Sequence, residues 1–359
     1  MKKVLFCTPT GGRTGSEMML LYLMQALGET VQPSVYTRQG KGEIFESYPV
    51  FSMPKRGDFL GPLYEGIYFK LFKKSSESAW ITSLQKKCTF DLWYLNTIQM
   101  HQLAPLAVEL GIPYWVHVHE LVSVYEEIPF KNFEFLLKHA TKIIACSKAV
   151  QDRLQEMGYA NSTLLYEGVI TSHIVPSGKI DVRKELNIPS DLYLWVMSGT
   201  TNLRKGYDLI PEVLAHLPKN HGILWVGGDS KTGLGHYVKS SCQQAGLFFF
   251  QVGPQVDLYY DYLDAGQGFV LMSREDPFPL VMQEAAYLGK CILGFSSGGI
   301  NEFVLPSFGE VVEGIQPKRL AEVMTAWSKR SDFGEFARQR ALDFDVNQRK
   351  SEFQALFQS

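Results

Sequence analysis

The chain has 359 residues, a length that is long for one domain and well suited to two. Hydrophobic residues make up 45% of it and aromatic residues 13%, which predicts large buried cores and excludes a disordered chain. The net charge of −2 gives no bulk electrostatic attraction to nucleic acid, so we expect no nucleic-acid partner.

The cysteines and the apolar runs indicate the compartment. Five cysteines are scattered without C-x-x-C spacing, and Cys7, Cys146 and Cys291 lie in apolar runs, which is typical of buried free thiols in a reducing environment. No run approaches the roughly 18 apolar residues of a membrane-spanning helix, and the N-terminal apolar run is too short for a signal peptide. We therefore expect a cytoplasmic protein, and a peripheral contact with the inner face of the membrane stays open.

Short apolar runs alternate with helical patterns along the whole chain. Helices are expected at 18–27, 132–139 and 148–157 in the first half. Such alternation predicts parallel sheets, and continuous apolar runs are typical of strands that are covered on both faces. The expected strands are 4–7, 34–36, 92–95, 114–118, 143–146 and 163–166 in the first half, and 192–197, 222–226, 247–252, 268–272, 291–294 and 310–312 in the second.

A linker is expected between the two halves. Residues 167–179 contain Gly168, Pro176 and Gly178 and show no hydrophobic periodicity. Two Rossmann-like halves would bind ligands beyond the carboxyl ends of their strands.

The first such loop is Thr8-Pro-Thr-Gly-Gly-Arg-Thr-Gly-Ser-Glu17, which follows the first strand and opens a helix. Its glycines allow a ligand to approach the backbone. A dinucleotide fingerprint, G-x-G-x-x-G, would need a glycine where Thr10 stands. The second strand ends in Thr37-Arg38 without an acid for a ribose, which leaves an NADP-dependent oxidoreductase as an alternative.

The segment His117-Val-His-Glu120 ends the fourth expected strand. Strand alternation places His117 and His119 on one face of the sheet. The pair H-x-H can bind a metal, and either histidine can instead belong to the core. No matching set of ligands follows downstream, so no metal site is expected.

Two loops of the second half carry charges suited to a nucleotide sugar. Gly199-Thr-Thr-Asn-Leu-Arg-Lys-Gly-Tyr-Asp208 follows the first strand of that half and brings Arg204 and Lys205 just before a helix. A guanidinium binds a diphosphate through two hydrogen bonds, and an ammonium adds a point charge. A solvated surface pair is the alternative reading of these two cations.

The second loop joins the strand at 268–273 to a helix expected at 280–288, and it holds Asp276. Glu284 lies one turn into the helix. The free N–H groups of a helix N-terminus suit a phosphate, and Leu280 and Val281 would donate them because Pro279 has none. Carboxylates on both sides of this phosphate seat would accept hydrogen bonds from vicinal hydroxyls.

This acidic segment resembles the E-x7-E motif of the retaining glycosyltransferases of family 4, which have the GT-B fold. Asp276 stands where the first Glu is usual, with Glu275 beside it as a competing carboxylate, and Pro279 stands where Gly is usual. The Arg204-Lys205-Gly206 triplet resembles the donor-phosphate loop of the same family. Thr200 and Thr201 occupy the region where that family often carries a further Arg.

The resemblance extends to the first half and to the remaining turns. Gly15-Ser16-Glu17 is similar to the ending of the family's first glycine-rich loop, and His119-Glu120 is similar to its His-acid pair. Gly298-Gly-Ile-Asn-Glu302 resembles its G-G-x-x-E loop. The likeness therefore covers nearly the whole chain.

The resemblance implies an α/β fold of the GT-B type, with two Rossmann-like parallel-sheet domains facing across a cleft. Residues 1–168 would form the acceptor-side domain, and 169–340 the domain that binds the nucleotide-sugar donor. Residues 341–359 would hold a helix, expected at 346–357, that crosses back to the first domain.

The implied activity is a retaining transfer of a hexosyl unit from a nucleotide diphosphate sugar, most often a UDP-sugar, to a saccharide or a lipid-linked saccharide. No cofactor and no metal are implied. His119 and Asp276 would be catalytic, and Glu284, Asp276 and Pro279 would bind the ribose and the sugar. The diphosphate would be held by Gly15, Ser16, Arg204, Lys205, Leu280 and Val281.

Two further functions stay open, a GT-B sugar-nucleotide epimerase and a non-catalytic nucleotide-sugar-binding partner in polysaccharide assembly. A basic amphipathic stretch from Leu63 to Lys87 could contact anionic lipid, or it could be a half-buried helix with a solvated face.

Overall fold

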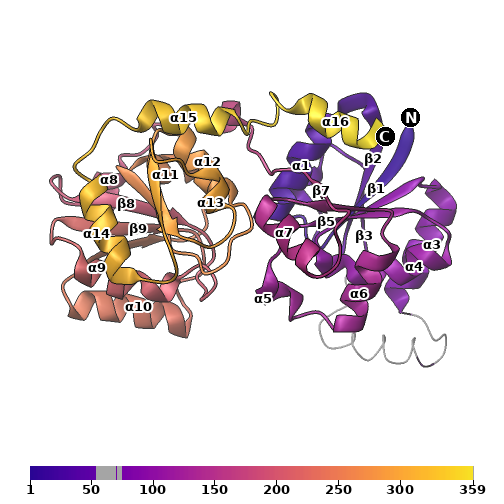
Figure 1. Cartoon of the computed structure of the whole chain (residues 1–359), viewed down its shortest axis with the longest axis horizontal. Helices are drawn as coiled ribbons and strands as arrows, with labels where there is room; N and C mark the ends of the chain where they lie inside the picture. Colours follow the sequence, from indigo (N-terminus) through magenta and orange to yellow (C-terminus); the bar gives the residue numbers. More distant parts are fainter. Residues whose placement is uncertain (54–69, 71–74, 359) are drawn as a thin grey trace. The chain divides into compact units, whose positions relative to one another are not determined.

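The computed structural model describes residues 1–53, 70 and 75–358, and contacts along the chain divide it into two compact units. Unit 1 comprises Met1–Tyr166 and Arg349–Ser359, and unit 2 comprises Glu167–Gln348. Each unit is built on one sheet of parallel strands (Figure 1).

The described part of unit 1 holds a seven-stranded sheet of order β3-β2-β1-β4-β5-β6-β7. In its register Cys7 pairs with Tyr36 on one side and with Leu95 on the other. The strands are β1 Lys2–Thr8, β2 Val31–Thr37, β3 Val50–Ser52, β4 Leu92–Asn96, β5 Tyr114–Val118, β6 Lys142–Ala145 and β7 Thr163–Leu164. The helices are α1 Gly15–Leu27, α3 Ser76–Cys88, α4 Ala104–Glu109, α5 Val122–Tyr125, α6 Phe130–His139, α7 Lys148–Glu156 and α16 Lys350–Gln358, with 3-10 turns η1 Gly28–Thr30, η2 Glu43–Phe45 and η3 Ile98–Leu103.

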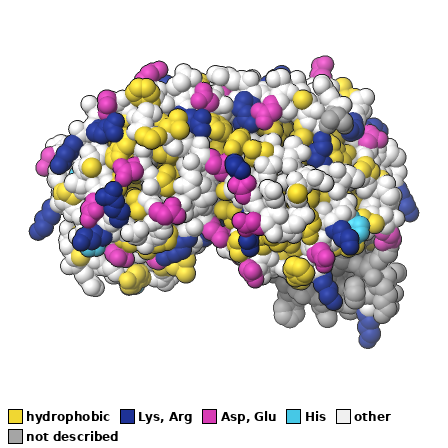
Figure 2. Space-filling view, viewed as in Figure 1, with side chains coloured by type: hydrophobic (Ala, Val, Ile, Leu, Met, Phe, Trp, Pro, Cys, Tyr) yellow, Lys and Arg dark blue, Asp and Glu magenta, His cyan; other side chains and the backbone are white. Residues whose placement is uncertain are grey.

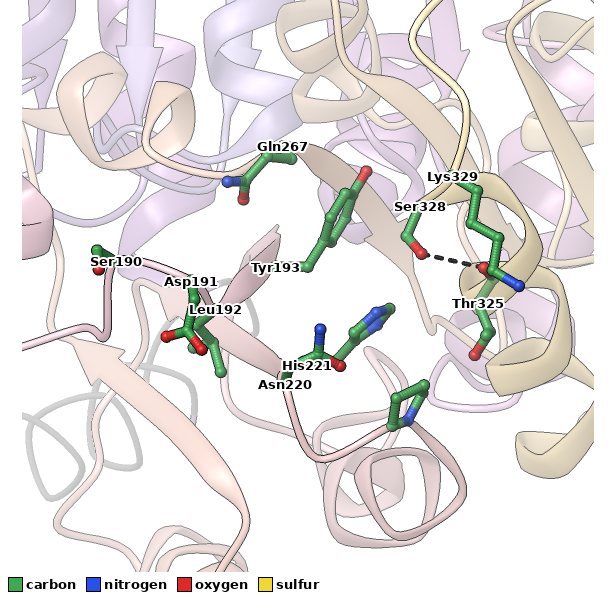
Figure 3. A pocket seen from close by; sticks show the side chains of 11 residues that line it. Ser190, Asp191, Leu192, Tyr193, Asn220, His221, Gln267, Thr325, Ser328 and Lys329 are labelled. Carbon is green, nitrogen blue, oxygen red and sulfur yellow. Dashed lines mark hydrogen bonds between the residues drawn. The ribbon is translucent and has the colours of Figure 1, made fainter.

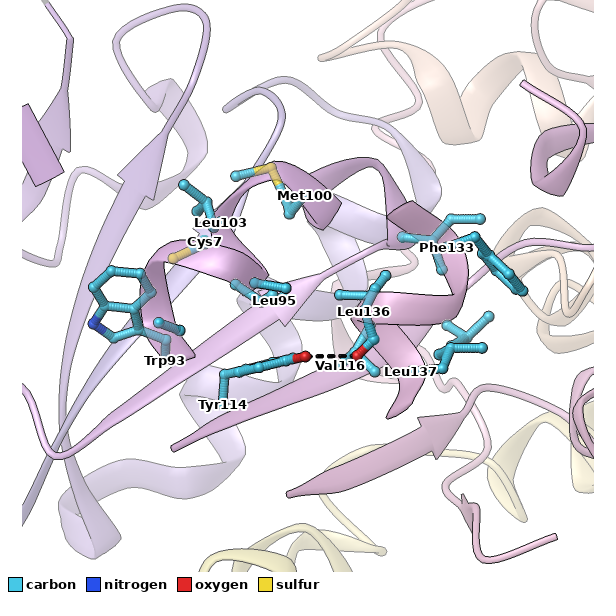
Figure 4. Close-up of a cluster of buried hydrophobic side chains, with 14 of the residues drawn as sticks. Cys7, Trp93, Leu95, Met100, Leu103, Tyr114, Val116, Phe133, Leu136 and Leu137 are labelled. Atoms are coloured by element: carbon cyan, nitrogen blue, oxygen red, sulfur yellow. Dashed lines mark hydrogen bonds between the residues drawn. The ribbon is translucent and has the colours of Figure 1, made fainter. Parts of the chain in front are cut away.

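The core of unit 1 explains why these runs become strands. Trp93 and Tyr114 are buried in the strands, and Leu136 of α6 belongs to the same cluster of buried side chains (Figure 4). The Tyr114 hydroxyl donates to the backbone oxygen of Leu136 at 2.7 Å, so burial leaves this polar group satisfied. Each such apolar side chain contributes roughly 1.5–3 kcal/mol when it leaves water.

The described part of unit 2 holds a six-stranded parallel sheet of order β10-β9-β8-β11-β12-β13. Its strands are β8 Tyr193–Ser198, β9 His221–Val226, β10 Phe248–Val252, β11 Gly268–Leu271, β12 Cys291–Phe295 and β13 Gly309–Val312. Its helices are α8 Val182–Glu185, α9 Ile210–His216, α10 Gly233–Gln244, α11 Tyr259–Asp264, α12 Leu280–Tyr287, α13 Ile300–Phe303, α14 Pro317–Trp327 and α15 Gly334–Leu342, with turns η4 Thr171–His173 and η5 Tyr207–Leu209. Helix α14 packs on α9, and α15 packs on α12.

Every strand that the apolar runs predicted is present, with ends that differ by at most three residues. The edge strand β3 was missed, because its three residues are only half-buried and carry no continuous apolar signal. The cysteines are free, and Cys7, Cys146 and Cys291 are buried as expected. Figure 2 shows positive and negative side chains intermixed on the visible face, in agreement with the small net charge.

The expected linker at 167–179 is instead a packed part of unit 2. Val169, Ile170 and Ile174 are buried, and a Cβ on Gly168 would lie 2.2 Å from the backbone oxygen of Phe344. The chain passes between the units at Tyr166 to Glu167 and again at Gln348 to Arg349. Local composition could not reveal this, because the partners of the segment come from the far end of the chain.

The C-terminal helix belongs to unit 1, but it begins at Lys350 and not at 346. The Phe357 ring lies 4.7 Å from the Trp115 ring, centroid to centroid, and also contacts Phe6 and Tyr94. Residues 341–348, which were assigned to the returning segment, are part of unit 2.

Asp345 forms hydrogen bonds with the two segments of unit 2 that lie next to the passages of the chain. Its buried carboxylate accepts hydrogen bonds from the backbone N–H of Thr171 at 2.8 Å and from the Thr171 hydroxyl. The other carboxylate oxygen accepts from the N–H groups of Asn347 at 2.7 Å and Gln348 at 3.2 Å. One side chain thus fixes the segments next to both passages.

We expect Asp345→Ala to destabilise unit 2 by about 3 kcal/mol, because the buried N–H and hydroxyl of Thr171 lose their acceptor. The measurement is the midpoint of urea unfolding, followed by the fluorescence of unit 2 tryptophans. Asp343→Ala is the matched control, since Asp343 is exposed and its carboxylate makes surface contacts, an ion pair with Arg340 and a 3.4 Å hydrogen bond from Gln339. Equal midpoints for the two variants would contradict the role of Asp345.

No helix among the described residues is long and apolar enough to cross a membrane. Residues 63–69 and 71–74 of the stretch from Leu63 to Lys87 lie outside the described part. Within it, α3 buries Ile81 and Leu84, and it exposes Lys86 and Lys87. This part is a half-buried helix with a solvated face, and lipid contact stays a prediction.

Candidate functional site

The strand order of each unit changes direction beside its first strand. In unit 1, β1 lies between β2 and β4, and in unit 2, β8 lies between β9 and β11. Loops that leave the carboxyl ends of such a strand pair diverge and open a crevice for a ligand. The loop before α1 follows β1, and the loops with Arg204 and Asp276 follow β8 and β11. These three loops therefore lie at the switch point of their own unit, and His119 follows β5, the neighbour of β4.

The glycine-rich loop of unit 1 closes around Glu17. This buried carboxylate accepts hydrogen bonds from the hydroxyls of Thr8 at 3.1 Å, Thr10 at 3.2 Å and Ser16 at 2.9 Å, and also from the hydroxyl of Thr14. Glu17 thus fixes the conformation of the loop. The backbone of Gly15 and Ser16 lies at the start of α1.

Asn96 connects this loop with His119. Its amide donates to the backbone oxygen of Ser16 at 3.1 Å, and its Oδ1 lies 2.9 Å from His119 Nε2. Asn96 is fully buried at the carboxyl end of β4, beside His117 in the register. We did not predict it, although a polar residue that ends an apolar run at a switch point was a usable signal.

His117 and Glu120 have structural roles. The Tyr94 hydroxyl lies 2.7 Å from His117 Nδ1, and burial, with a smaller effect of His119, lowers the pKa of His117 well below its ordinary value. Glu120 accepts from the backbone N–H groups of His119 at 2.9 Å and Ile98 at 3.4 Å. Burial raises the pKa of Glu120 to about 7 against these hydrogen bonds. Of the expected His-acid pair, His119 is the residue that a ligand could meet.

Arg38 does not fit the alternative of an NADP site. Its Nε forms a 2.9 Å ion pair with Glu77, which also accepts from the Tyr36 hydroxyl at 2.7 Å, and its Nη1 donates to the backbone oxygen of Gln99. The Arg38 guanidinium connects the end of β2 with α3 and η3. A phosphate could bind it only by displacing the Glu77 carboxylate.

In unit 2, the loop after β8 and the loop after β11 are tied together. Arg204 Nη1 donates to the backbone oxygen of Glu275 at 2.9 Å, and the N–H of Arg274 donates to the backbone oxygen of Arg204 at 2.7 Å. Gly206 has a φ of +70°, and a Cβ there would lie 2.0 Å from the backbone oxygen of Met272. Only glycine permits this close approach.

Lys205 and Asp276 form a buried ion pair. Lys205 Nζ lies 2.6 Å from Asp276 Oδ2, and the two side chains are 14% and 6% exposed. The Ser273 hydroxyl donates to the same oxygen at 2.9 Å. The backbone of Asp276 forms a bridge with Gly298, which fixes its position next to the G-G-x-x-E loop. The cation that we assigned to the phosphate and the carboxylate that we assigned to the sugar are therefore neighbours.

Helix α12 begins at Leu280, directly after Pro279, as predicted. Its first N–H groups, those of Leu280 and Val281, have no partner within the helix. The preceding loop is anchored by Phe278, whose ring packs on Phe303 and Phe344. Asp276 and the start of α12 are thus held by the core of unit 2.

Glu284 lies buried on α12, and two tyrosines of α11 hold its carboxylate. Tyr259 donates to Oε2 at 3.0 Å, and Tyr260 donates to Oε1 at 3.2 Å. Burial raises the pKa of Glu284 to about 7, and the two phenols act in the opposite direction. We did not predict Tyr259 and Tyr260, because nothing in the local sequence links α11 with α12.

A pocket of about 370 Å³ lies elsewhere in unit 2 (Figure 3). It is lined by Tyr193 and His221, which begin β8 and β9, and by Thr325, Ser328 and Lys329 at the end of α14. This is the amino edge of the sheet, whereas Ser198 and Gly199 leave the carboxyl edge. None of the predicted site residues lines this pocket.

Arg274 braces the two loops of unit 2. It forms two 2.8 Å hydrogen bonds with the Asp208 carboxylate and donates to the backbone oxygen of Leu203. We expect Arg274→Gln to weaken nucleotide diphosphate binding by about tenfold, because Arg204 and Lys205 lose their fixed backbone. Calorimetric titration of the unliganded protein with a nucleotide diphosphate measures this affinity. Arg330→Gln, which removes an exposed pair with Asp332, should leave the affinity unchanged. An Arg274→Gln affinity equal to that of this control would contradict the bracing role.

Known glycosyltransferase families match both halves of the chain. A model described as Glycosyl transferases group 1 matches residues 178–341, and a model described as Glycosyltransferase Family 4 matches residues 13–173. The chain belongs to this family of glycosyltransferases. The expected resemblance is thereby confirmed.

Solved structures of glycosyltransferases superpose on this chain along nearly its whole length. HepE of Anabaena, solved in complex with UDP-glucose, superposes with a TM-score of 0.82 at 20% identity, over 99% of this chain and 100% of that one. Sucrose-phosphate synthase of Thermosynechococcus elongatus superposes with a TM-score of 0.76 at 17% identity, over 100% of both chains. The predicted GT-B fold, with two Rossmann-like parallel-sheet domains, is confirmed.

Curated relatives match over shorter segments. The O-antigen biosynthesis glycosyltransferase WclY of Escherichia coli is 26% identical over 148 residues, which is 41% of this chain and 41% of that protein. The D-inositol 3-phosphate glycosyltransferase of Xylanimonas cellulosilytica is 28% identical over 150 residues, which is 40% of this chain and 36% of that protein. The chain thus spans about two fifths of the length of these curated relatives.

Proposed function

We propose that this glycosyltransferase moves a hexosyl unit from a UDP-sugar to a saccharide or lipid-linked saccharide, with retention at the anomeric carbon and without a metal. Unit 2 would bind the donor, and unit 1 would bind the acceptor. The observation that carries the proposal is the arrangement of Lys205, Asp276 and Glu284 around the N-terminus of α12. The complex of HepE with UDP-glucose supports the choice of uridine as the nucleoside.

The charges suit a departing diphosphate. Lys205 and Arg204 carry the positive charge, and the N–H groups of Leu280 and Val281 add the helix terminus. In unit 1, the N–H groups of Gly15 and Ser16 at the start of α1 are assigned the same role. These groups would stabilise the negative charge that develops as the bond from the anomeric carbon to the diphosphate oxygen breaks. A divalent cation is not required for that task.

The carboxylates would divide the remaining contacts. Glu284 accepts hydrogen bonds from the ribose hydroxyls, and Asp276 accepts them from the donor sugar, beside Pro279. The acceptor hydroxyl attacks the face that the diphosphate leaves, and its proton passes to the departing phosphate oxygen. His119, held by Asn96, orients a sugar hydroxyl next to the reacting carbon. We assign the role of the first carboxylate to Asp276 and not to Glu275, because the Asp276 carboxylate lies beside Lys205.

The test is a binding and hydrolysis assay. UDP should bind more tightly than ADP or GDP in calorimetry, and slow hydrolysis of the right UDP-hexose should release first the anomer of the configuration present in the donor, as detected by proton NMR. Turnover should survive excess EDTA. Absence of binding for every nucleotide diphosphate, or release of the opposite anomer first, would refute the proposal in its binding or its stereochemical part.

A further inference from the structure

We propose that Tyr259 and Tyr260 are positioning residues for the donor, which hold the Glu284 carboxylate in the orientation that accepts the two ribose hydroxyls. This inference rests on the proposed function and adds to it two residues outside the acidic motif. Both tyrosines begin α11, and Glu284 lies on α12.

The geometry leaves room for a diol. Tyr259 donates to one carboxylate oxygen and Tyr260 to the other, at 3.0 and 3.2 Å. An ionised carboxylate has about four acceptor positions, two on each oxygen. Each oxygen therefore keeps one position for a ribose hydroxyl. Two phenols on different oxygens also stop the carboxylate from rotating, so the free positions point in a fixed direction.

Tyr259 also links Glu284 with the phosphate loop. Its hydroxyl lies 3.2 Å from the hydroxyl of Ser198, the last residue of β8, and Gly199 follows directly. Tyr259 has a single hydroxyl proton, so when it donates to the carboxylate it can accept from Ser198. A change at Glu284 is thus transmitted to the start of the loop that carries Lys205.

Helix α11, which carries the two tyrosines, is anchored through Asp261. Asp261, next to Tyr260, accepts hydrogen bonds from the N–H of Ser177 at 2.9 Å, from its hydroxyl at 2.8 Å and from the N–H of Gly178 at 2.7 Å. These bonds fasten α11 to the segment that follows η4. The helix that carries the two phenols is therefore anchored, and the phenols cannot follow a carboxylate that moves.

The phenols also favour the charged carboxylate. Burial raises the pKa of Glu284, and the hydrogen bonds from Tyr259 and Tyr260 lower it, with no charged group of the described residues among the causes. Burial and Glu284 raise the pKa of Tyr259 well above its ordinary value, so it remains a hydrogen-bond donor. Without the phenols, Glu284 would hold its proton to a higher pH and could accept fewer ribose hydroxyls.

The experiment compares wild type with Tyr259→Phe, Tyr260→Phe and the double variant. Calorimetric titrations with UDP and with 2′-deoxy-UDP run from about pH 5.5 to about pH 8.5. Tyr237→Phe is the matched control, because Tyr237 is 59% exposed on α10. Each single variant should lose about tenfold in UDP affinity at neutral pH and less in 2′-deoxy-UDP affinity. The pH midpoint of UDP binding should rise in each variant.

The outcomes separate the inference from the proposed function. If wild type binds UDP and the midpoint of Tyr259→Phe and Tyr260→Phe equals that of Tyr237→Phe, the positioning role is overturned and the function stands. The same holds if both ligands lose affinity equally, which would indicate a general structural effect. If wild type binds no UDP at any pH, the proposed function fails and the inference fails with it.

Discussion

Replacing Lys205 with methionine should both destabilise unit 2 and weaken UDP binding, and a second substitution should restore only the stability. Methionine keeps much of the side-chain volume but leaves Asp276 as a buried carboxylate without its cation. Removing one partner of a buried ion pair costs about 3–5 kcal/mol. The Ser273 hydroxyl, which still donates to Asp276, favours the lower value.

The double variant Lys205→Met with Asp276→Asn removes the unpaired charge. It should recover most of the lost stability, because a neutral amide beside methionine has no ion to compensate. UDP affinity should stay at least about tenfold below wild type, since the diphosphate has lost a charge-assisted bond. Asp276→Asn alone should keep UDP affinity and lose turnover, because its carboxylate is assigned to the donor sugar.

Urea unfolding and calorimetry measure the two effects separately. The matched control is Lys290→Met, which breaks the 2.7 Å pair with Asp264 beyond the C-terminal end of α12 and should not change UDP affinity. A double variant as unstable as the single variant would show that the ion pair is not the source of the loss. Wild-type UDP affinity in Lys205→Met would remove Lys205 from the diphosphate site.

Glu284→Gln should make the protein more stable at pH 8 and weaken UDP binding at the same time. The pKa of Glu284 rises from its ordinary 4.5 to about 7 on folding. Between these two values the folded state keeps a proton that the unfolded state releases. The stabilisation of the folded state by this bound proton is complete below about pH 4.5 and is lost as the pH rises to about 7.

The neutral amide of the Glu284→Gln variant does not titrate, so the variant does not lose this stability as the pH rises. At about 1.4 kcal/mol per pKa unit, Glu284→Gln should gain up to about 3 kcal/mol at pH 8 and almost nothing near pH 4.5. UDP affinity should fall about tenfold or more, because an amide has one oxygen for a diol. Urea midpoints at several pH values, together with calorimetry, test both effects.

Two variants sharpen this test. Glu322→Gln on α14, an exposed acid, should change neither quantity. Glu120 in unit 1 also has a pKa raised to about 7, so Glu120→Gln should remove a second share of the same pH dependence. A Glu284→Gln protein that is less stable than wild type at pH 8 would show that burial does not disfavour the ionised carboxylate.

The sequence by itself determined the fold, and it predicted the residues of the candidate site. The apolar runs are strands because parallel strands buried on both faces need continuous hydrophobic residues, and this signal is local. Arg204, Lys205, Asp276 and Glu284 could be selected because each follows such a run or opens the next helix. The motif spacing is likewise a property of a single loop and helix.

The tertiary structure alone decided which groups meet. Lys205 and Asp276 pair across 71 residues, and Tyr260 reaches Glu284 across 24. Asp345 binds Thr171 across 174 residues and so turns the expected linker into a packed segment. The short edge strand β3 likewise exists only through its pairing with β2. Such contacts depend on which loops the sheet order brings to one edge, and that order is set by the packing of the whole unit, which no window of sequence contains.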